Sequence, residues 1–133
     1  MKNTEIEIVL EFVEGINSAD IGKIVNLMSD EHIFIDSGDC KYQGKDFMKQ
    51  GWINYFTMFP DYKIEIIDII GGIPIVGIFG YASGTFIGMK NKNNSNYFRI
   101  PASWKAIVQE GKVVYWQVFC ESKQIEQIVE SNK

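Results

Sequence analysis

Most of the second half of the chain, residues 62–119, has the pattern of consecutive β-strands. Strands are predicted over 62–70, 75–87, 97–109 and 112–120, and the dipeptides Gly71-Gly72 and Glu110-Gly111 supply turns between them. The second of these strands contains Gly77, Gly80 and Gly84, which predict bending over a helix or a bulge. A sheet with such a strand must curve.

Helices are predicted before and after this run of strands. Apolar residues recur at helical spacing over 4–16, again from Ile21 to Met28 with Asn17 as the cap, and after Gly44 up to the stop at Pro60. One strand, residues 32–37, precedes the polar loop that leads to Gly44, and a last helix is predicted over 122–131. A polar loop tip is expected at residues 90–96. Helices followed by a run of antiparallel strands indicate the α+β class.

Composition limits the classes of function. With 133 residues, 46% of them hydrophobic, the chain is expected to form one domain. The net charge is −4 and Arg99 is the only arginine, which argues against a nucleic-acid partner. The N-terminus lacks the apolar core of a signal peptide, and charged, glycine and proline residues interrupt the longest apolar stretch. We therefore expect a soluble, cytoplasmic protein without a membrane partner.

The cysteines and the histidine of the chain give little support for metal or redox chemistry. Cys40 and Cys120 are too few for a disulfide framework and are expected to be reduced. His32 is the only histidine, so a zinc centre is not expected. No metal and no cofactor is predicted.

Several short motifs, taken in their order and spacing, resemble one known superfamily. They occupy residues 17–21, 32–36, 42–45, 55–64 and 111–116. Together they resemble the nuclear transport factor 2-like superfamily, which includes ketosteroid isomerases, SnoaL-like polyketide cyclases and scytalone dehydratases. The resemblance covers nearly the whole chain and implies a single SnoaL-like or ketosteroid isomerase-like domain over 1–133. It implies a cone-shaped, curved antiparallel sheet wrapped around a long helix, with a short N-terminal helix pair.

The resemblance also implies a catalytic position for Asp36. Ketosteroid isomerases use an aspartate base with a tyrosine and a protonated acid that hydrogen-bond the substrate oxygen. Asp36 falls at the position of the base, Phe12 at the tyrosine and Ser103 near the protonated acid. Phenylalanine donates no hydrogen bond, whereas a serine hydroxyl can donate one. The implied activity is cofactor-free isomerisation, cyclisation or dehydration of a small apolar carbonyl compound, with Asp36 and Ser103 as catalytic residues.

A pocket around Asp36 would be walled by apolar and aromatic side chains. Phe34 lies on the same strand face as Asp36, and Trp116, Val118 and Cys120 share one face of the last strand. The full set of expected substrate-binding residues is Phe12, Phe34, Trp52, Tyr55, Trp116, Val118 and Cys120. Core packing is the competing interpretation for the aromatic residues.

Other interpretations stand beside this one. Asp36 can instead accept backbone N–H groups of residues 37–39 in a turn. Glu121 is a possible second acid by resemblance to polyketide cyclases, or an acid at the start of the last helix. The whole protein can instead be a non-catalytic ligand-binding or dimeric interaction domain. A homodimer is expected through the outer sheet face, where Phe79, Tyr81 and Phe86 are the candidate surface residues.

Overall fold

The computed structural model describes residues 4–88, 90 and 94–133, so part of the polar loop predicted at 90–96 lies outside the described residues. The elements follow the predicted α+β order with one extra strand. They are α1 (Glu5–Asn17), α2 (Ile21–Leu27), β1 (Met28–Ile35), β2 (Lys41–Gln43), α3 (Lys45–Met58), β3 (Lys63–Gly71), β4 (Ile75–Thr85), β5 (Tyr97–Gln109), β6 (Lys112–Cys120) and α4 (Lys123–Ser131).

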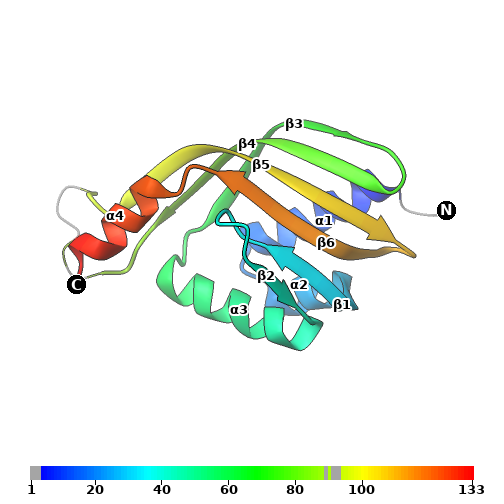
Figure 1. Cartoon of the computed structure of the whole chain (residues 1–133), viewed down its shortest axis with the longest axis horizontal. Helices are drawn as coiled ribbons and strands as arrows, with labels where there is room; N and C mark the ends of the chain where they lie inside the picture. Colours follow the sequence, from blue (N-terminus) through cyan, green and yellow to red (C-terminus); the bar gives the residue numbers. More distant parts are fainter. Residues whose placement is uncertain (1–3, 89, 91–93) are drawn as a thin grey trace.

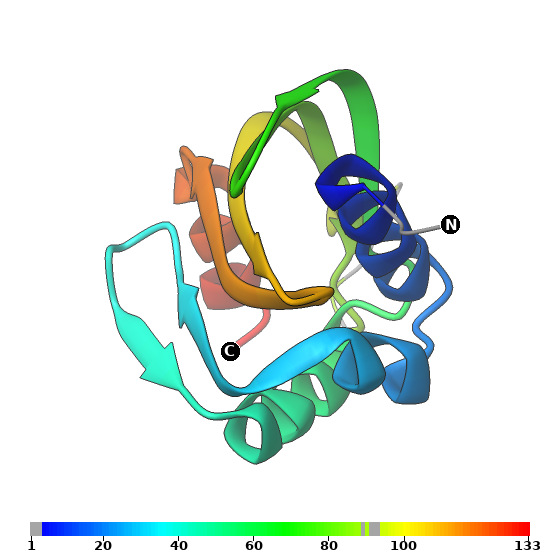
Figure 2. The ribbon, with the colours of Figure 1, turned by 90° about the vertical axis from the view of Figure 1, so that its right-hand side faces the viewer.

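The described strands form one sheet in the order β2-β1-β6-β5-β4-β3. The β1–β6 pair is parallel and the other pairs are antiparallel. Figures 1 and 2 show the sheet curving over α1, α2 and α3, whereas α4 lies near one end. The predicted fold class, a curved sheet around a helix with an N-terminal helix pair, is confirmed. None of the helices in the described ranges is long and apolar enough to cross a membrane.

Strict alternation in β5 explains which sheet face is buried. Every even-numbered residue from Phe98 to Val108 is buried, and the odd-numbered ones are exposed or half-buried. The predicted hairpin to β6 is confirmed with its bounds, because Glu110 and Gly111 take positive φ angles of 52° and 75°, as a two-residue turn requires. The inner face therefore meets the buried side of α1 and α3. It contributes Phe98, Ile100, Trp104 and Val108 to the core.

The bend predicted from glycines in the second long strand is also present. The β3–β4 register shifts between Ile66 and Asp68, opposite Gly80. A Cβ on Gly80 would collide with the carbonyl oxygen of Glu65, so the two backbones approach closely only because this residue is glycine. The bulge increases the local twist of the sheet.

Two local predictions are corrected. Asp20, not Asn17, caps α2, because its carboxylate accepts the N–H of Lys23 at 3.1 Å. The Asn17 amide instead bonds both backbone groups of Ile64, at 2.8 Å to its N–H and 3.0 Å to its carbonyl, and so joins α1 to β3. The loop before α3 contains β2, which pairs with the end of β1.

Candidate functional site

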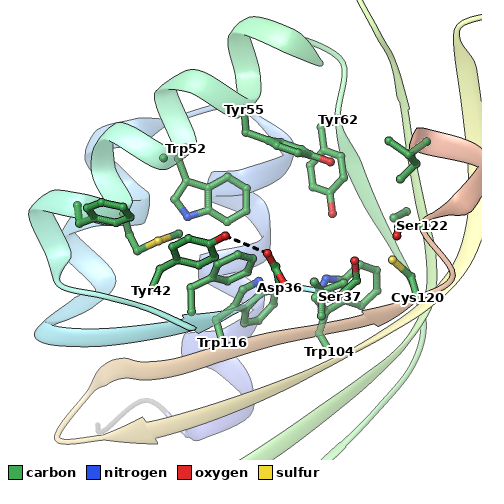
Figure 3. Close-up of a pocket in the computed structure, with 17 residues that line it drawn as sticks. Asp36, Ser37, Tyr42, Trp52, Tyr55, Tyr62, Trp104, Trp116, Cys120 and Ser122 are labelled. Atoms are coloured by element: carbon green, nitrogen blue, oxygen red, sulfur yellow. Dashed lines mark hydrogen bonds between the residues drawn. The ribbon is translucent and has the colours of Figure 1, made fainter. Parts of the chain in front are cut away.

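A cavity of about 380 Å³ lies between α3 and the inner face of the sheet. Helix α3 supplies Met48, Gly51, Trp52 and Tyr55, and β5 and β6 supply the opposite wall. The structure brings together most of the predicted site: Phe34, Asp36, Trp52, Tyr55, Trp116, Val118 and Cys120 all line this cavity. Figure 3 shows these side chains around one hollow. Their placement was predicted, and their roles stay predictions.

Asp36 comes directly after β1 and its carboxylate is already engaged. Oδ1 accepts the backbone N–H groups of Gly38 and Cys40, each at 2.9 Å, and Oδ2 accepts the hydroxyl of Tyr42 at 3.1 Å. Asp36 is half-buried and lines the cavity, so the turn interpretation and the pocket interpretation both describe it. A carboxylate offers about four acceptor positions. Among the described contacts one position on Oδ2 therefore remains for a ligand.

Tyr42 is a site residue that the sequence analysis missed. It lies on β2, and three residues of strand are too short to show a periodic pattern. The hydrogen bond to Asp36, and then the negative charge of that carboxylate, raise the pKa of the Tyr42 phenol. Tyr42 therefore stays protonated and keeps donating to Asp36.

Ser103 does not line the cavity, which corrects its predicted placement. Its pairing partners across the sheet are Phe79 on β4 and Phe119 on β6, and both of these are exposed. The alternation of β5 turns the neighbours Ala102 and Trp104 inward and Ser103 outward. Ser103 therefore cannot steady a substrate oxygen inside the cavity.

Phe12 and Glu121 also lie outside the cavity lining. Phe12 is completely buried and packs edge-on against Trp116, with ring centroids 5.0 Å apart, so it belongs to the core behind the wall. Glu121 is exposed, and the residue that follows it, Ser122, lines the cavity in its place. Both placements are corrections to the predicted set.

Two phenols and one thiol in the cavity lining, those of Tyr55, Tyr62 and Cys120, stay protonated. Burial raises the pKa of Tyr55 and raises the pKa of Tyr62 well above the ordinary phenol value. The indole N–H of Trp104 interacts with the Tyr62 hydroxyl. Burial also raises the pKa of the Cys120 thiol, and a hydrogen bond with Ser37 offsets this in part. A protonated thiol is a poor nucleophile, so Cys120 is a wall residue.

Tyr62 and Trp104 were not among the predicted site residues. The alternation of β5 contains the signal for Trp104, because that residue shares a face with Ala102 and Ala106. Tyr62 lies just before β3, and the signal for it is the alternation at the start of the predicted strand 62–70, where Tyr62 and Ile64 are buried and Lys63 is exposed. Within the described residues no cluster of three His, Cys, Asp or Glu side chains is arranged to hold a metal ion.

Comparison with known proteins identifies the fold. No protein-family model matches the sequence, and no curated protein matches it. A protein described as a SnoaL-like polyketide cyclase from Shewanella denitrificans superimposes with a TM-score of 0.80 at 13% identity, covering 96% of this chain and 97% of that one. A hypothetical protein with a ketosteroid isomerase-like fold from Catenulispora acidiphila gives 0.78 at 12% identity, covering 90% and 88%. An NTF2-like protein of unknown function from Cytophaga hutchinsonii gives 0.73 at 13%, covering 95% and 97%.

The protein has the nuclear transport factor 2-like fold. The structural matches confirm the fold that the resemblance in the sequence motifs implied. At these identities the likeness concerns the fold alone, and one such fold carries many chemistries. The function of this chain therefore depends on the residues of its own cavity.

Proposed function

We propose that this NTF2-like protein binds a small, largely apolar molecule in the cavity between α3 and the sheet. The observation that carries the proposal is the cavity itself: about 380 Å³, walled by aromatic rings, with the half-buried Asp36 carboxylate at its surface. Ligand sites are commonly about 300–1,000 Å³, mostly apolar, with a few placed polar groups. The lining of this cavity has that character.

Asp36 gives the site a preference for a ligand that donates a hydrogen bond. Asp36 lines the cavity, and the described contacts leave one acceptor position of Oδ2 unused; Figure 3 shows the hydrogen bond that joins Asp36 to the Tyr42 hydroxyl. A hydrogen bond to a charged group contributes about 1.5–3 kcal/mol, which is roughly tenfold or more in affinity. A hydroxyl on a ring-sized apolar molecule matches this arrangement.

Equilibrium dialysis with 2-naphthol and 2-methoxynaphthalene tests the proposal. Both compounds present the same rings, but only 2-naphthol donates a hydrogen bond. We expect Asp36→Asn to weaken 2-naphthol binding about tenfold and to leave 2-methoxynaphthalene unchanged. Asp39→Asn is the matched control, because Asp39 is exposed in the same loop and asparagine tolerates its positive φ of 66°. Failure of both compounds to bind would contradict the proposal.

A second candidate function is cofactor-free proton transfer with Asp36 as the base, as in isomerisation, cyclisation or dehydration of a carbonyl compound. The observation in its favour is a half-buried carboxylate that lines the cavity and has one acceptor position unused by the described contacts. A base must reach the proton that it removes, and this position meets that requirement for a ligand in the cavity. Because Ser103 faces outward, other donors would have to steady the substrate oxygen.

Hydrogen exchange at carbon separates this candidate from simple binding. The methyl hydrogens of 2-acetylnaphthalene lie next to its carbonyl, so a base in the cavity should speed their replacement by deuterium in D₂O. We expect Asp36→Asn to remove the acceleration and Asp39→Asn to keep it, as followed by proton NMR. A bound ketone whose exchange rate matches the rate in buffer would identify a non-catalytic binding domain.

Pairing through the outer sheet face is proposed for the assembly. Phe79 and Phe119 are 48% and 47% exposed and flank Ser103 in the sheet register. Tyr81 shares this face, and the guanidinium of Arg99 lies 3.8 Å from the centre of its ring. Phe86 does not belong to this surface, because it packs on the core residue Phe59 with ring centroids 5.5 Å apart. The two exposed rings are the basis of a homodimer or of an interaction domain.

A further inference from the structure

The lining of the cavity carries a negative charge that no cation balances. Asp36 supplies the only carboxylate of the described lining, which holds no lysine, arginine or histidine. The three groups that bond to this carboxylate, two backbone N–H groups and one hydroxyl, are all neutral donors. Asp36 takes part in none of the ion pairs among the described residues. An anionic ligand would therefore be repelled by this cavity, and a cationic ligand would be attracted.

Three aromatic rings form corners in the cavity wall. The rings of Trp52 and Tyr55 meet at 84° with their centroids 6.3 Å apart, and those of Tyr55 and Tyr62 meet at 89° with their centroids 5.0 Å apart. All three rings line the cavity. A group in the corner between two perpendicular rings contacts a face of each. Because the face of an aromatic ring carries negative partial charge, such a corner favours a positive group.

Two tryptophans of the sheet complete the wall. Trp104 on β5 and Trp116 on β6 are 2% and 1% exposed and line the same cavity. Figure 3 shows Asp36 between these two indoles and the rings of Trp52 and Tyr55. Of the aromatic side chains, the indole of tryptophan attracts a cation over its face most strongly. A positive group in the hollow therefore has both a carboxylate and aromatic rings around it.

We propose that the cavity binds an organic cation, namely a protonated tertiary amine with an aromatic ring as its body. This inference rests on the proposed binding function of the cavity and names the ligand class for it. The N⁺–H group donates to the acceptor position of Asp36 Oδ2 that the described contacts leave unused, and the carbon groups on the nitrogen lie against the ring faces.

The number of free acceptor positions decides between classes of amine. A primary ammonium group carries three N–H donors, and two of them would lose water without a place on the Asp36 carboxylate. A protonated tertiary amine carries one donor, which the single unused position satisfies. The net charge of the protein, −4, also favours the approach of a cation.

Two ligands of nearly equal shape test the proposal. 2-(Dimethylaminomethyl)naphthalene is protonated at neutral pH, and 2-isobutylnaphthalene has a C–H in place of its N⁺–H. By equilibrium dialysis at pH 7 we expect the wild-type protein to bind the amine about tenfold more tightly than the hydrocarbon. Asp36→Asn should remove most of this preference. Asp39→Asn is the matched control, because it changes the net charge equally from an exposed position in the same loop and should keep the preference.

Fluorinated tryptophan tests the ring faces with little change of shape. Fluorine withdraws electron density from the indole ring and so weakens its attraction for a cation. The three tryptophans of the chain all line the cavity, so protein grown on 5-fluorotryptophan or 5,7-difluorotryptophan carries every label there. We expect the preference for the amine to fall stepwise with the two labels, by about twofold or more with the second. The affinity for the hydrocarbon should stay nearly constant.

The outcomes separate this inference from the binding function on which it rests. The cation site would be overturned by equal affinity of the wild type for the two ligands, by a preference that Asp36→Asn retains, or by one that fluorination leaves unchanged. In each of these cases binding of the hydrocarbon would leave the proposed binding function standing. Binding of neither ligand would overturn both.

Discussion

His32 is a core residue, completely buried beside Phe12. Its Nδ1 lies 2.7 Å from the carbonyl oxygen of Val113, and because a carbonyl only accepts, Nδ1 carries the proton. Nε2 is buried without a hydrogen-bond partner. Burial lowers the pKa of His32 below its ordinary value of 6.5, and the bond to Val113 opposes this shift in part.

We predict that acid destabilises the protein through this residue. Because the folded-state pKa is lowered, the unfolded chain binds the proton first, so the full stability is present above pH 6.5 and is lost as the pH falls below it. The free energy of unfolding should fall by up to about 1.4 kcal/mol per pH unit. Urea unfolding between pH 7 and pH 5.5 measures it. His32→Gln, which does not titrate, should give a flatter profile, and identical profiles would contradict the assignment.

The predicted position of Ser103 depended on whether strand alternation or alignment to the superfamily pattern was used. The apolar alternation of β5 already shows that Ser103 shares a face with Arg99, Pro101 and Lys105, yet alignment to the superfamily pattern put it near the cavity. The alternation was the better guide, because it reflects the physical burial of this chain. For Asp36 the position just after β1 was readable, but its three hydrogen-bond partners were not, since two come from loop backbone and one from β2.

At the scale of elements, long periodic segments were predictable and short or bulged ones were not. β5 and β6 have the predicted bounds because each has a clear face and a turn with glycine between them. β2 was missed because its three residues form a strand only through pairing with β1. The β3–β4 bulge was indicated by the glycines of β4, although its exact partner on β3 was not.

The close approach of β3 and β4 at Gly80 depends on the absence of a side chain there. Gly80→Ala should lower the free energy of unfolding by about 3 kcal/mol or more, because the new methyl group would meet the backbone oxygen of Glu65, which cannot move aside without breaking the sheet. Gly72→Ala is the control, because nothing lies within 4 Å of a Cβ built there. Chemical denaturation of the three proteins measures the difference. Equal stability of both variants would contradict the collision predicted at residue 80.

The whole molecule has one covered sheet face and one that carries exposed phenylalanine rings. If the outer face pairs two copies, replacing Phe79 and Phe119 by glutamate should give a monomer at concentrations where the wild type sediments as a dimer, because four charges would be buried without partners. Analytical ultracentrifugation decides this. Leu10→Glu, at a 42% exposed position of α1, controls for added charge. A monomeric wild type at high concentration would contradict the pairing.

The three tryptophans of the chain, Trp52, Trp104 and Trp116, all border the same cavity. All of the tryptophan fluorescence of the folded protein therefore originates around this one cavity. A ligand that enters the cavity would change the polarity around all three tryptophans at once. Ligand occupancy can thus be followed in dilute solution by intrinsic tryptophan fluorescence, without an attached dye. The same measurement can screen natural extracts for a ligand.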